Sequence, residues 1–305
     1  MSDQAAALRA FALSSQGRAP APSPMPLRVD APVVVEKPRL AKAVAIASGK
    51  GGVGKSNIAA NLAAILSGQG RRVVLFDADM GCANADLLCG LSPKATLEDV
   101  LHGRCRLAEV MLRGPGGFRL IPGASGVAHL ASLDVLQRTT LLSQLGALDQ
   151  VVDLMLIDLG AGLGCDTIAF ASAADTVLVV CTPEPTSITD AYGAIKAIAA
   201  TSRGTDLRLV VNMASSEAEG VAVHRRIHRV AAEHLGVKVG LAGIVPFDFA
   251  IRKAVKKRQL VLEDAPRSRA TRAIRTIGRS LEDLLPNDEK NSRRGGFLQR
   301  LLGPR

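Results

Sequence analysis

Two lysines lie in one glycine-rich stretch of the sequence, SGKGGVGKSN, at residues 48–57. Residues 49–56 fit the pattern G-x-x-x-x-G-K-[ST], which predicts a loop whose backbone amides surround phosphate oxygens at the start of a helix. In this pattern Lys55 reaches the β- and γ-phosphates, and the hydroxyl of Ser56 ligates Mg²⁺. Lys50 lies at the start of the loop, so we expect it to point away from its own subunit's phosphates. We assign nucleotide binding to Gly49, Lys50, Gly51, Gly52, Val53, Gly54, Lys55, Ser56 and Asn57.

Polar side chains follow three other apolar runs of the chain. Asp77 and Asp79 end RRVVLFDAD, Asp158 ends VDLMLID, and Asn212 ends LVVN. Ligands of open α/β sheets bind at the carboxyl ends of the strands. Asn212 is either a residue that contacts the ligand or a turn residue at the end of a strand.

The elements that position these residues are short apolar runs separated by longer amphipathic stretches. The runs are continuous rather than alternating, as in strands that are buried on both faces of a parallel sheet. Helices are predicted at 56–68, 134–148, 186–202 and 217–235. This alternation predicts an α/β fold, a three-layer P-loop NTPase domain at residues 41–285 with a mostly parallel central sheet flanked by helices. The runs are KAVAIAS, RRVVLFDAD, GFRLIPG, VDLMLID, TVLVVCTP, LRLVVNMA and GLAGIVPFD.

Composition limits the class of protein. The chain has 305 residues with a net charge of +10, and its five cysteines show no C-x-x-C spacing, which favours reduced thiols in a cytoplasmic protein. We expect no membrane-spanning helix and no secretory signal, because long apolar runs are absent. Residues 252–279 carry ten basic residues against two acidic ones. This basic cluster is either a solvated helical face or a surface for lipid, nucleic acid or an acidic partner.

The first 40 residues differ from the domain that follows. Residues 2–13 favour a short helix, and we assign residues 1–14 to an N-terminal segment. Residues 15–40 are rich in proline and are predicted to stay extended as a tether. The prolines are Pro20, Pro22, Pro24, Pro26, Pro32 and Pro38.

The stretch KGGVGKS resembles the deviant Walker A motif of the MinD/ParA class of ATPases. In that class the extra lysine crosses a dimer interface and contacts the partner's ATP, which gives Lys50 a catalytic role beside Lys55. The segment DADMGCANAD matches the pattern D-x-D-x-G-x-x-N-x-D. The resemblance places Asp77 near the Mg²⁺ shell and gives Asp79 the role of positioning the attacking water. It also implies that Asp158 reaches Mg²⁺ and that Asn212 contacts adenine.

Further segments resemble the FlhG (FleN) family within this class. The pattern D-Q-A-x-x-L-R resembles an activator motif that docks on FlhF, a signal-recognition-type GTPase. TPEPTSITDAY and FDFAIRKAVKKRQLV are also similar to that family, and the resemblance covers residues 2–12 and about 42–285. It implies a slow ATPase that dimerises on ATP, associates with the membrane and regulates flagellar number or placement, with flagellar C-ring or regulatory proteins as further partners. The candidate partner-binding residues are Asp3, Gln4, Ala5, Leu8 and Arg9.

The tail at residues 286–305 ends in an amphipathic pattern, GGFLQRLLG. Its large apolar residues lie on one side of a helix and are flanked by arginines, and the pattern resembles the membrane-targeting helix of MinD. We therefore expect peripheral attachment to the inner face of the cell membrane. A disordered tail, or a helix docked on its own core, are the alternatives. The candidate membrane residues are Phe297, Leu298, Leu301 and Leu302.

Two departures from the family pattern leave other functions open. Leu159 replaces the threonine that commonly follows Asp158, which puts the hydrogen bonding of the switch in doubt. Cys165 lies where iron–sulphur relatives place a cluster ligand, but GPGG at 114–117 lacks the second cysteine, so we expect Cys165 to be buried. The alternatives are a ParA/MinD-like partitioning or cell-division positioning ATPase, an adaptor that binds nucleotide without hydrolysing it, and an iron–sulphur reductase. We expect protein and lipid partners rather than nucleic acid.

Overall fold

The computed structural model describes residues 41–79, 83–123, 140, 143–144, 146–148, 151–202, 204–284 and 297–302. The chain divides into two units, residues 1–37 and 38–305, and everything described below belongs to the second unit. The N-terminal segment at 1–14, the tether at 15–40 and most of the helix expected at 134–148 lie outside the described residues. Those assignments therefore stay predictions.

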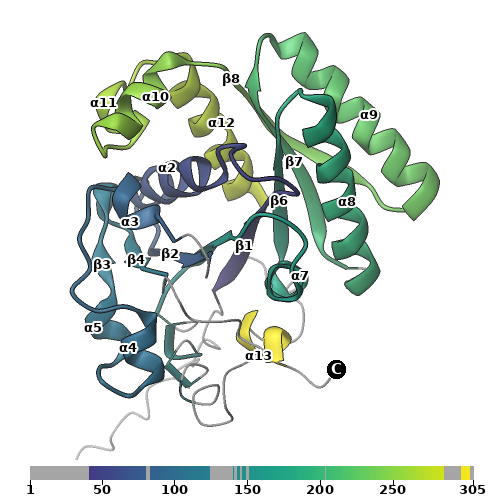
Figure 1. The fold of residues 1–305 in the computed structure, drawn as a ribbon. Helices are drawn as coiled ribbons and strands as arrows, with labels where there is room; N and C mark the ends of the chain where they lie inside the picture. The colour runs from purple at the N-terminus through teal and green to yellow at the C-terminus, as the bar shows by residue number, and fades with distance from the viewer. Residues whose placement is uncertain are drawn as a thin grey trace, which may run out of the picture. The chain divides into compact units, whose positions relative to one another are not determined.

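An eight-stranded sheet forms the centre of the fold, in the order β3-β4-β2-β5-β1-β6-β7-β8 (Figure 1). All neighbouring strands are parallel except β3, which pairs antiparallel with β4 at one edge. Each of the seven apolar runs contains one strand of this sheet, which confirms the prediction of a mostly parallel sheet. The strands are β1 (Lys42–Ala47), β2 (Val73–Ala78), β3 (Leu112–Arg113), β4 (Arg119–Ile121), β5 (Leu154–Leu159), β6 (Thr176–Cys181), β7 (Asp206–Ala214) and β8 (Val239–Pro246).

Helices cover both faces of this sheet and bury two separate apolar clusters. One cluster lies under α2, α3 and α10–α12, and the other lies under α4, α5, α7–α9 and α13. Since apolar residues on both faces are removed from water, the central strands are almost fully buried. The helices are α2 (Lys55–Gly68), α3 (Ala85–Leu88), α4 (Leu97–Leu101), α5 (Leu107–Val110), η1 (Pro115–Gly117), α7 (Cys165–Ala173), α8 (Pro185–Thr201), α9 (Glu217–Leu235), α10 (Phe249–Lys256), α11 (Val261–Asp264), α12 (Arg269–Leu284) and α13 (Phe297–Leu302).

The strand order brings the predicted polar residues to one edge of the sheet. β5 lies between β1 and β2, and Asp158 pairs in register with Ile46 on one side and with Asp77 on the other. Because these strands are parallel, the glycine-rich loop after β1 and both carboxylates emerge side by side. β7 lies two strands from β1, and Asn212 reaches the same edge from there.

The tail helix α13 packs against α7 (Figure 1). Phe297 is 1% exposed and stacks on Phe170, with ring centroids 6.2 Å apart. The guanidinium of Arg300 donates to the carbonyl of Ala173 at 2.7 Å and forms an ion pair of 3.0 Å with Asp175. The alternative of a helix docked on its own core is therefore the arrangement observed. No described helix is both long and apolar enough to cross a membrane.

Candidate functional site

The glycine-rich loop runs from the end of β1 into the first turn of α2. Gly52 and Gly54 have φ angles of 78° and 89°, a left-handed conformation that strongly favours glycine. Gly54 is also the N-cap of α2, so the unpaired amides of the first helical turn point into the loop. These amides and the positive end of the helix dipole form a site suited to a phosphate group.

Asn212 holds this loop in place from the end of β7. Its Nδ2 donates to the carbonyl of Val53 at 2.7 Å, and the residue is buried. A Cβ at Gly54 would collide with the same amide group, so this close approach also requires glycine. The Oδ1 of Asn212 has no hydrogen-bond partner within the described part of the chain. The contact with the loop is a role that the sequence did not reveal, and the adenine contact stays a prediction.

Lys55 and Asp158 form a buried ion pair at the centre of the site. The Nζ of Lys55 lies 3.3 Å from Oδ1 of Asp158, and the two side chains are 8% and 1% exposed. Burial raises the pKa of Asp158, while the charge of Lys55 and a hydrogen bond from Ser56 lower it. Burial therefore holds the Lys55–Asp158 pair in place between the start of α2 and β5.

Asp77 is engaged by the backbone of the loop that follows β2. One carboxylate oxygen accepts from the amides of Asn84 and Ala85, both at 3.0 Å, and the other accepts from the amide of Asp79 at 3.2 Å. Burial, followed by the charge of Asp158, raises the pKa of Asp77 to about 7. Asp77 therefore anchors the segment that carries Asp79.

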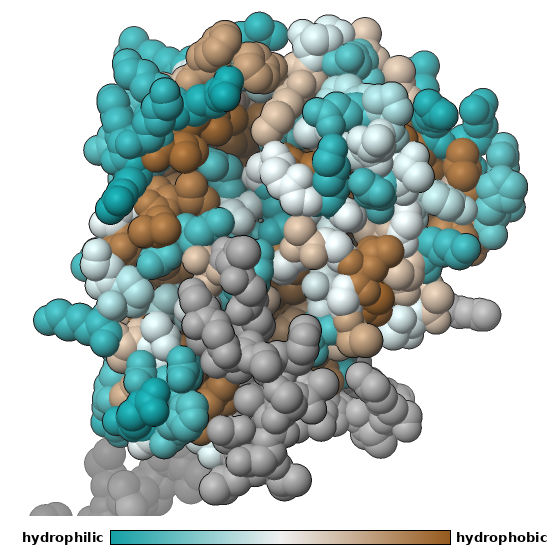
Figure 2. Space-filling model, viewed as in Figure 1, coloured by the Kyte–Doolittle hydropathy of each residue, from teal (hydrophilic) through white to brown (hydrophobic). Residues whose placement is uncertain are grey.

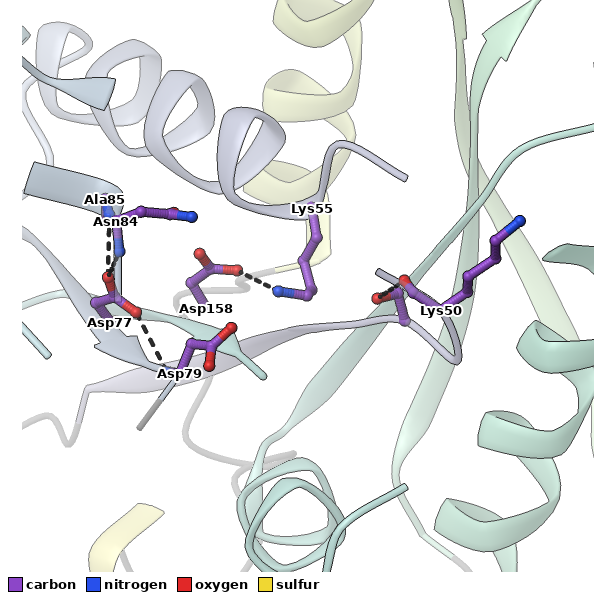
Figure 3. A network of polar contacts seen from close by, with 8 residues as sticks. Lys50, Lys55, Asp77, Asp79, Asn84, Ala85 and Asp158 are labelled. Atoms are coloured by element: carbon purple, nitrogen blue, oxygen red, sulfur yellow. Dashed lines mark hydrogen bonds and ion pairs between the residues drawn. The ribbon is translucent and has the colours of Figure 1, made fainter. Parts of the chain in front are cut away.

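Asp79 faces the loop after β5. A Cβ at Gly160 would lie 3.5 Å from Oδ1 of Asp79, and Figure 3 shows the carboxylates of Asp79 and Asp158 close to Lys55. Asp79 also raises the pKa of Asp158 through its charge. The loop after β5 is joined to the glycine-rich loop, because the amide of Gly162 donates to the carbonyl of Ser48 at 3.0 Å.

The two departures from the family pattern have different outcomes. Leu159 is fully buried in the core, and its aliphatic side chain has no hydrogen-bonding group to offer the switch. The two loops are joined by the backbone bond from Gly162 to Ser48. The expectation for Cys165 is wrong, because this residue is exposed at the first position of α7. Among the described residues, no group of three or more His, Cys, Asp or Glu side chains could hold a metal ion by itself.

Lys50 points out of the loop and away from Lys55 (Figure 3). Its Nζ lies 3.0 Å from Glu184 and 3.3 Å from the hydroxyl of Thr186, at the start of α8. The side chains of Lys50 and Glu184 are 41% and 64% exposed. The direction of the side chain agrees with the expectation for Lys50, while its contact with a second subunit stays a prediction. Sequence reasoning did not find Glu184 as its partner.

A pocket of about 910 Å³ extends from the glycine-rich loop to α10. At one end it is polar, with Lys55, Ser56 and Asp79 in its lining. At the other end it has an apolar wall that sequence reasoning missed. In Figure 2, apolar residues lie among hydrophilic ones over α10 and α11. The wall consists of Met213, Phe247, Ile251 and Val255. This combination suits a ligand that joins a polyphosphate to a flat, mostly apolar ring system.

The polar end fits Mg²⁺. Oδ2 of Asp158 is buried and has no hydrogen-bond partner among the described residues. Ser56 and Asp79 line the same pocket, the Ser56 hydroxyl is hydrogen-bonded to Asp158, and oxygen ligands are those that Mg²⁺ prefers. Asp77 is less suited to ligate the ion directly than Asp158, because both of its carboxylate oxygens already accept backbone hydrogen bonds.

Comparisons with known proteins agree with this geometry. The profile of the CobQ/CobB/MinD/ParA nucleotide binding domain matches residues 44–261. The chain is 42% identical to the antiactivator FleN of Pseudomonas aeruginosa over 239 residues, which are 78% of this chain and 85% of that protein. It is 35% identical to the flagellum site-determining protein YlxH of Helicobacter pylori over 86% of this chain and 90% of that protein.

The fold is shared with a solved MinD structure. The cell division ATPase MinD of Pyrococcus furiosus superimposes with a TM-score of 0.64 at 25% identity, covering 80% of this chain and all of that one. The loop geometry, the strand order and these similarities agree. The chain therefore belongs to the MinD/ParA family of P-loop ATPases, and within it to the FlhG (FleN) group.

Proposed function

We propose that this protein hydrolyses ATP slowly, that ATP joins two copies of the chain, and that the cycle regulates the number or placement of flagella. The observation that carries this proposal is the position of Lys50. Its side chain points away from Lys55 and is 41% exposed, where the nucleotide of a second copy can receive it. The names of the relatives, an antiactivator and a flagellum site-determining protein, support the flagellar task.

The residues of the site divide the work of hydrolysis. Lys55 and the amides of the loop hold the β- and γ-phosphates, and Lys50 of the facing copy neutralises charge on the same phosphates. Asp79 orients the attacking water, while Asp77 fixes the segment that carries Asp79. Ser56 and Asp158 would hold Mg²⁺, which would supply positive charge at the phosphate oxygens.

Membrane attachment requires α13 to leave α7. Phe297 and Leu301 pack on the core, so they cannot meet lipid while α13 is docked. Each apolar side chain that moves from the core into lipid exchanges one apolar environment for another. The free energy gained when α13 leaves α7 for the membrane is therefore small. Two released tails on one dimer bind with avidity, which adds roughly 10²–10⁴-fold to a weak single tail. Attachment therefore depends on dimer formation.

The mass of the particle in solution tests the proposal. Light scattering on Asp79→Ala, which blocks hydrolysis, should show twice the monomer mass with Mg²⁺ and ATP and the monomer mass with ADP. Lys50→Ala should stay monomeric with either nucleotide, and only the dimer should sediment with anionic liposomes. An unchanged mass with ATP would overturn the proposal. Strong ATP-dependent binding to DNA without binding to liposomes would favour a partitioning ATPase.

The flagellar task has a separate test. Residues 1–20, as a peptide, should stimulate GTP hydrolysis by an FlhF-type GTPase through Gln4 and Arg9, and Arg9→Ala should abolish the effect. C-ring and regulatory proteins are further candidate partners for the dimer. If the peptide leaves GTP hydrolysis unchanged, the link to FlhF fails while the ATPase activity stands.

A further inference from the structure

Four arginines form an exposed stripe along α12. Its buried side, with Ala270, Ile274, Ile277 and Leu281, packs into the core that α12 shares with α2. The arginines are spaced by three or four residues, so they lie on one side of the helix over about 15 Å. We call them the arginine stripe, and its members are Arg269, Arg272, Arg275 and Arg279.

The stripe ends beside two acidic residues of α12, Glu282 and Asp283, which lie three and four positions after Arg279. The other three arginines have no acidic residue three or four positions away on this helix. Within the described residues, the ion pair that involves α12 joins Arg71 to Glu282, near the end of the helix. A guanidinium nitrogen of Arg279 donates to the hydroxyl of Thr276 at 3.5 Å. Like charges three and four residues apart destabilise a helix. A bound anionic partner would offset this repulsion.

A groove of about 470 Å³ runs beside the stripe, between the end of α2, η1, α11 and α12. Its floor is apolar, and Arg275 and Arg279 stand on one wall. Gly68, the last residue of α2, leaves room, because a Cβ there would meet no atom within 4 Å. The floor is made by Ala64, Ile65, Gly68 and Leu262.

The groove is separate from the nucleotide pocket and from the tail. The two pockets share no lining residue. The groove lies on the sheet face covered by α2 and α12, whereas α13 belongs to the cluster on the other face (Figure 1). The groove and docked α13 therefore lie on opposite faces of the sheet.

We propose that the groove and the arginine stripe dock an acidic amphipathic segment of a partner protein. Apolar side chains of the segment fill the groove, and its carboxylates pair with Arg275 and Arg279. The planar fork of arginine suits a carboxylate, which it can hold through two hydrogen bonds. A nucleic acid would be held by charge alone and would leave the apolar floor uncovered. The groove therefore favours protein over nucleic acid, and this surface is additional to the proposed ATP-dependent dimer.

Fluorescence anisotropy on the full chain tests the proposal with a labelled synthetic peptide. The peptide has 16 residues of leucine, alanine and glutamate, with leucines on one helical side and glutamates beside them. A matched peptide carries glutamine in place of glutamate. The glutamate peptide should bind at least about tenfold more tightly than the glutamine peptide. Arg275→Glu/Arg279→Glu should lose about the same factor.

Two further variants separate the groove from charge alone. Gly68→Phe fills the groove without changing the charge, so it should weaken binding of the glutamate peptide by several-fold. Arg225→Glu/Arg229→Glu is the matched control, because these arginines are exposed on α9 at the same spacing. It should leave binding within twofold. Circular dichroism and nucleotide binding verify that each variant is folded.

Several results would overturn the proposal. One is an equal loss of peptide affinity in Arg225→Glu/Arg229→Glu and in Arg275→Glu/Arg279→Glu, which would mean nonspecific charge attraction. Another is wild-type affinity in Gly68→Phe together with tighter binding of a 20-base-pair duplex, which would identify a nucleic-acid surface. Absence of binding by the glutamate peptide up to about 1 mM would leave no docking site.

Discussion

Lys50 and Lys55 lie in one loop, yet their ammonium groups have opposite surroundings. Lys55 is 8% exposed and pairs with the fully buried Asp158, whereas Lys50 is 41% exposed and pairs with Glu184 at the surface. Breaking a buried pair leaves a charge without water, while an exposed pair contributes little to stability. One lysine is therefore tied to the fold and to its own site, and the other is available for a new partner.

The largest effect is expected for Lys55→Ala. ATP hydrolysis should fall roughly a thousandfold, because a positive charge at the phosphates is lost. The free energy of unfolding should fall by about 3 kcal/mol at pH 8, because Asp158 remains buried without its partner. Phosphate release and urea denaturation measure the two effects.

A second variant distinguishes a lost ion pair from a general packing defect. Asp158→Asn in the Lys55→Ala background removes the uncompensated carboxylate, so about half of the lost stability should return. If Lys55→Ala alone leaves the free energy of unfolding unchanged within 0.5 kcal/mol, a typical scatter for surface substitutions, the buried side of the comparison is wrong.

The buried carboxylates should also make stability depend on pH. The pKa of Asp77 is raised to about 7 in the folded state, so the folded protein keeps a proton that the unfolded chain releases above about pH 4. The stability that this proton provides is lost as pH rises towards 7. Between pH 5 and pH 8 the loss is about 3 kcal/mol. Urea denaturation at both pH values should show it.

Asp77→Asn should flatten this pH dependence, because the side chain no longer titrates. Part of the slope should remain, since burial raises the pKa of Asp158 in the same direction. Glu184→Gln is the control from the exposed side, and its slope should match the wild type. A wild-type slope in Asp77→Asn would show that Asp77 does not titrate in this range.

Lys50→Ala should affect the dimer and spare the fold. Its free energy of unfolding should stay within about 0.5 kcal/mol of the wild type, since the lost pair is exposed. ATP-dependent dimer formation should be lost, and hydrolysis should fall about a hundredfold. Equilibrium dialysis should find ATP still bound by the monomer. Loss of ATP binding would instead place Lys50 in its own subunit's site.

The sequence predicted the buried side of this comparison well. The runs that end in Asp77, Asp79 and Asp158 are continuous and apolar, so they could only be central strands, and parallel strands bring their ends together. The motif also fixed the order loop, Lys55, helix. The sequence pattern and the structure agree here because the position of each carboxylate is set by the strand that precedes it.

Contacts between segments distant in the chain were not predictable in the same way. Nothing near Lys50 in the sequence identifies Glu184, which lies 134 residues away. The amphipathic pattern of α13 suits a lipid surface and a protein core equally, and only the fold shows Phe297 stacked on Phe170. Cys165 is exposed because α7 begins at the surface, which its apolar character did not indicate. The apolar wall of the pocket likewise required the position of α10.

The smallest expected effect is that of Glu184→Gln, and it tests the exposed side most directly. In the monomer Glu184 holds Lys50 at 3.0 Å, and Lys50 must leave this partner before it can reach the nucleotide of a second copy. Exposed pairs contribute about 0.2–1 kcal/mol each, and a symmetric dimer breaks two of them. Removing the carboxylate should therefore strengthen ATP-dependent dimer formation by about two- to thirtyfold. Sedimentation equilibrium in the Asp79→Ala background measures this gain. Glu217→Gln, at another exposed acidic residue in the first turn of α9, is the control and should leave the dimer constant unchanged. A weaker dimer in Glu184→Gln would mean that Glu184 also contacts the second copy. Lys50 would then stay paired with Glu184 in the dimer instead of leaving it for the nucleotide of the second copy.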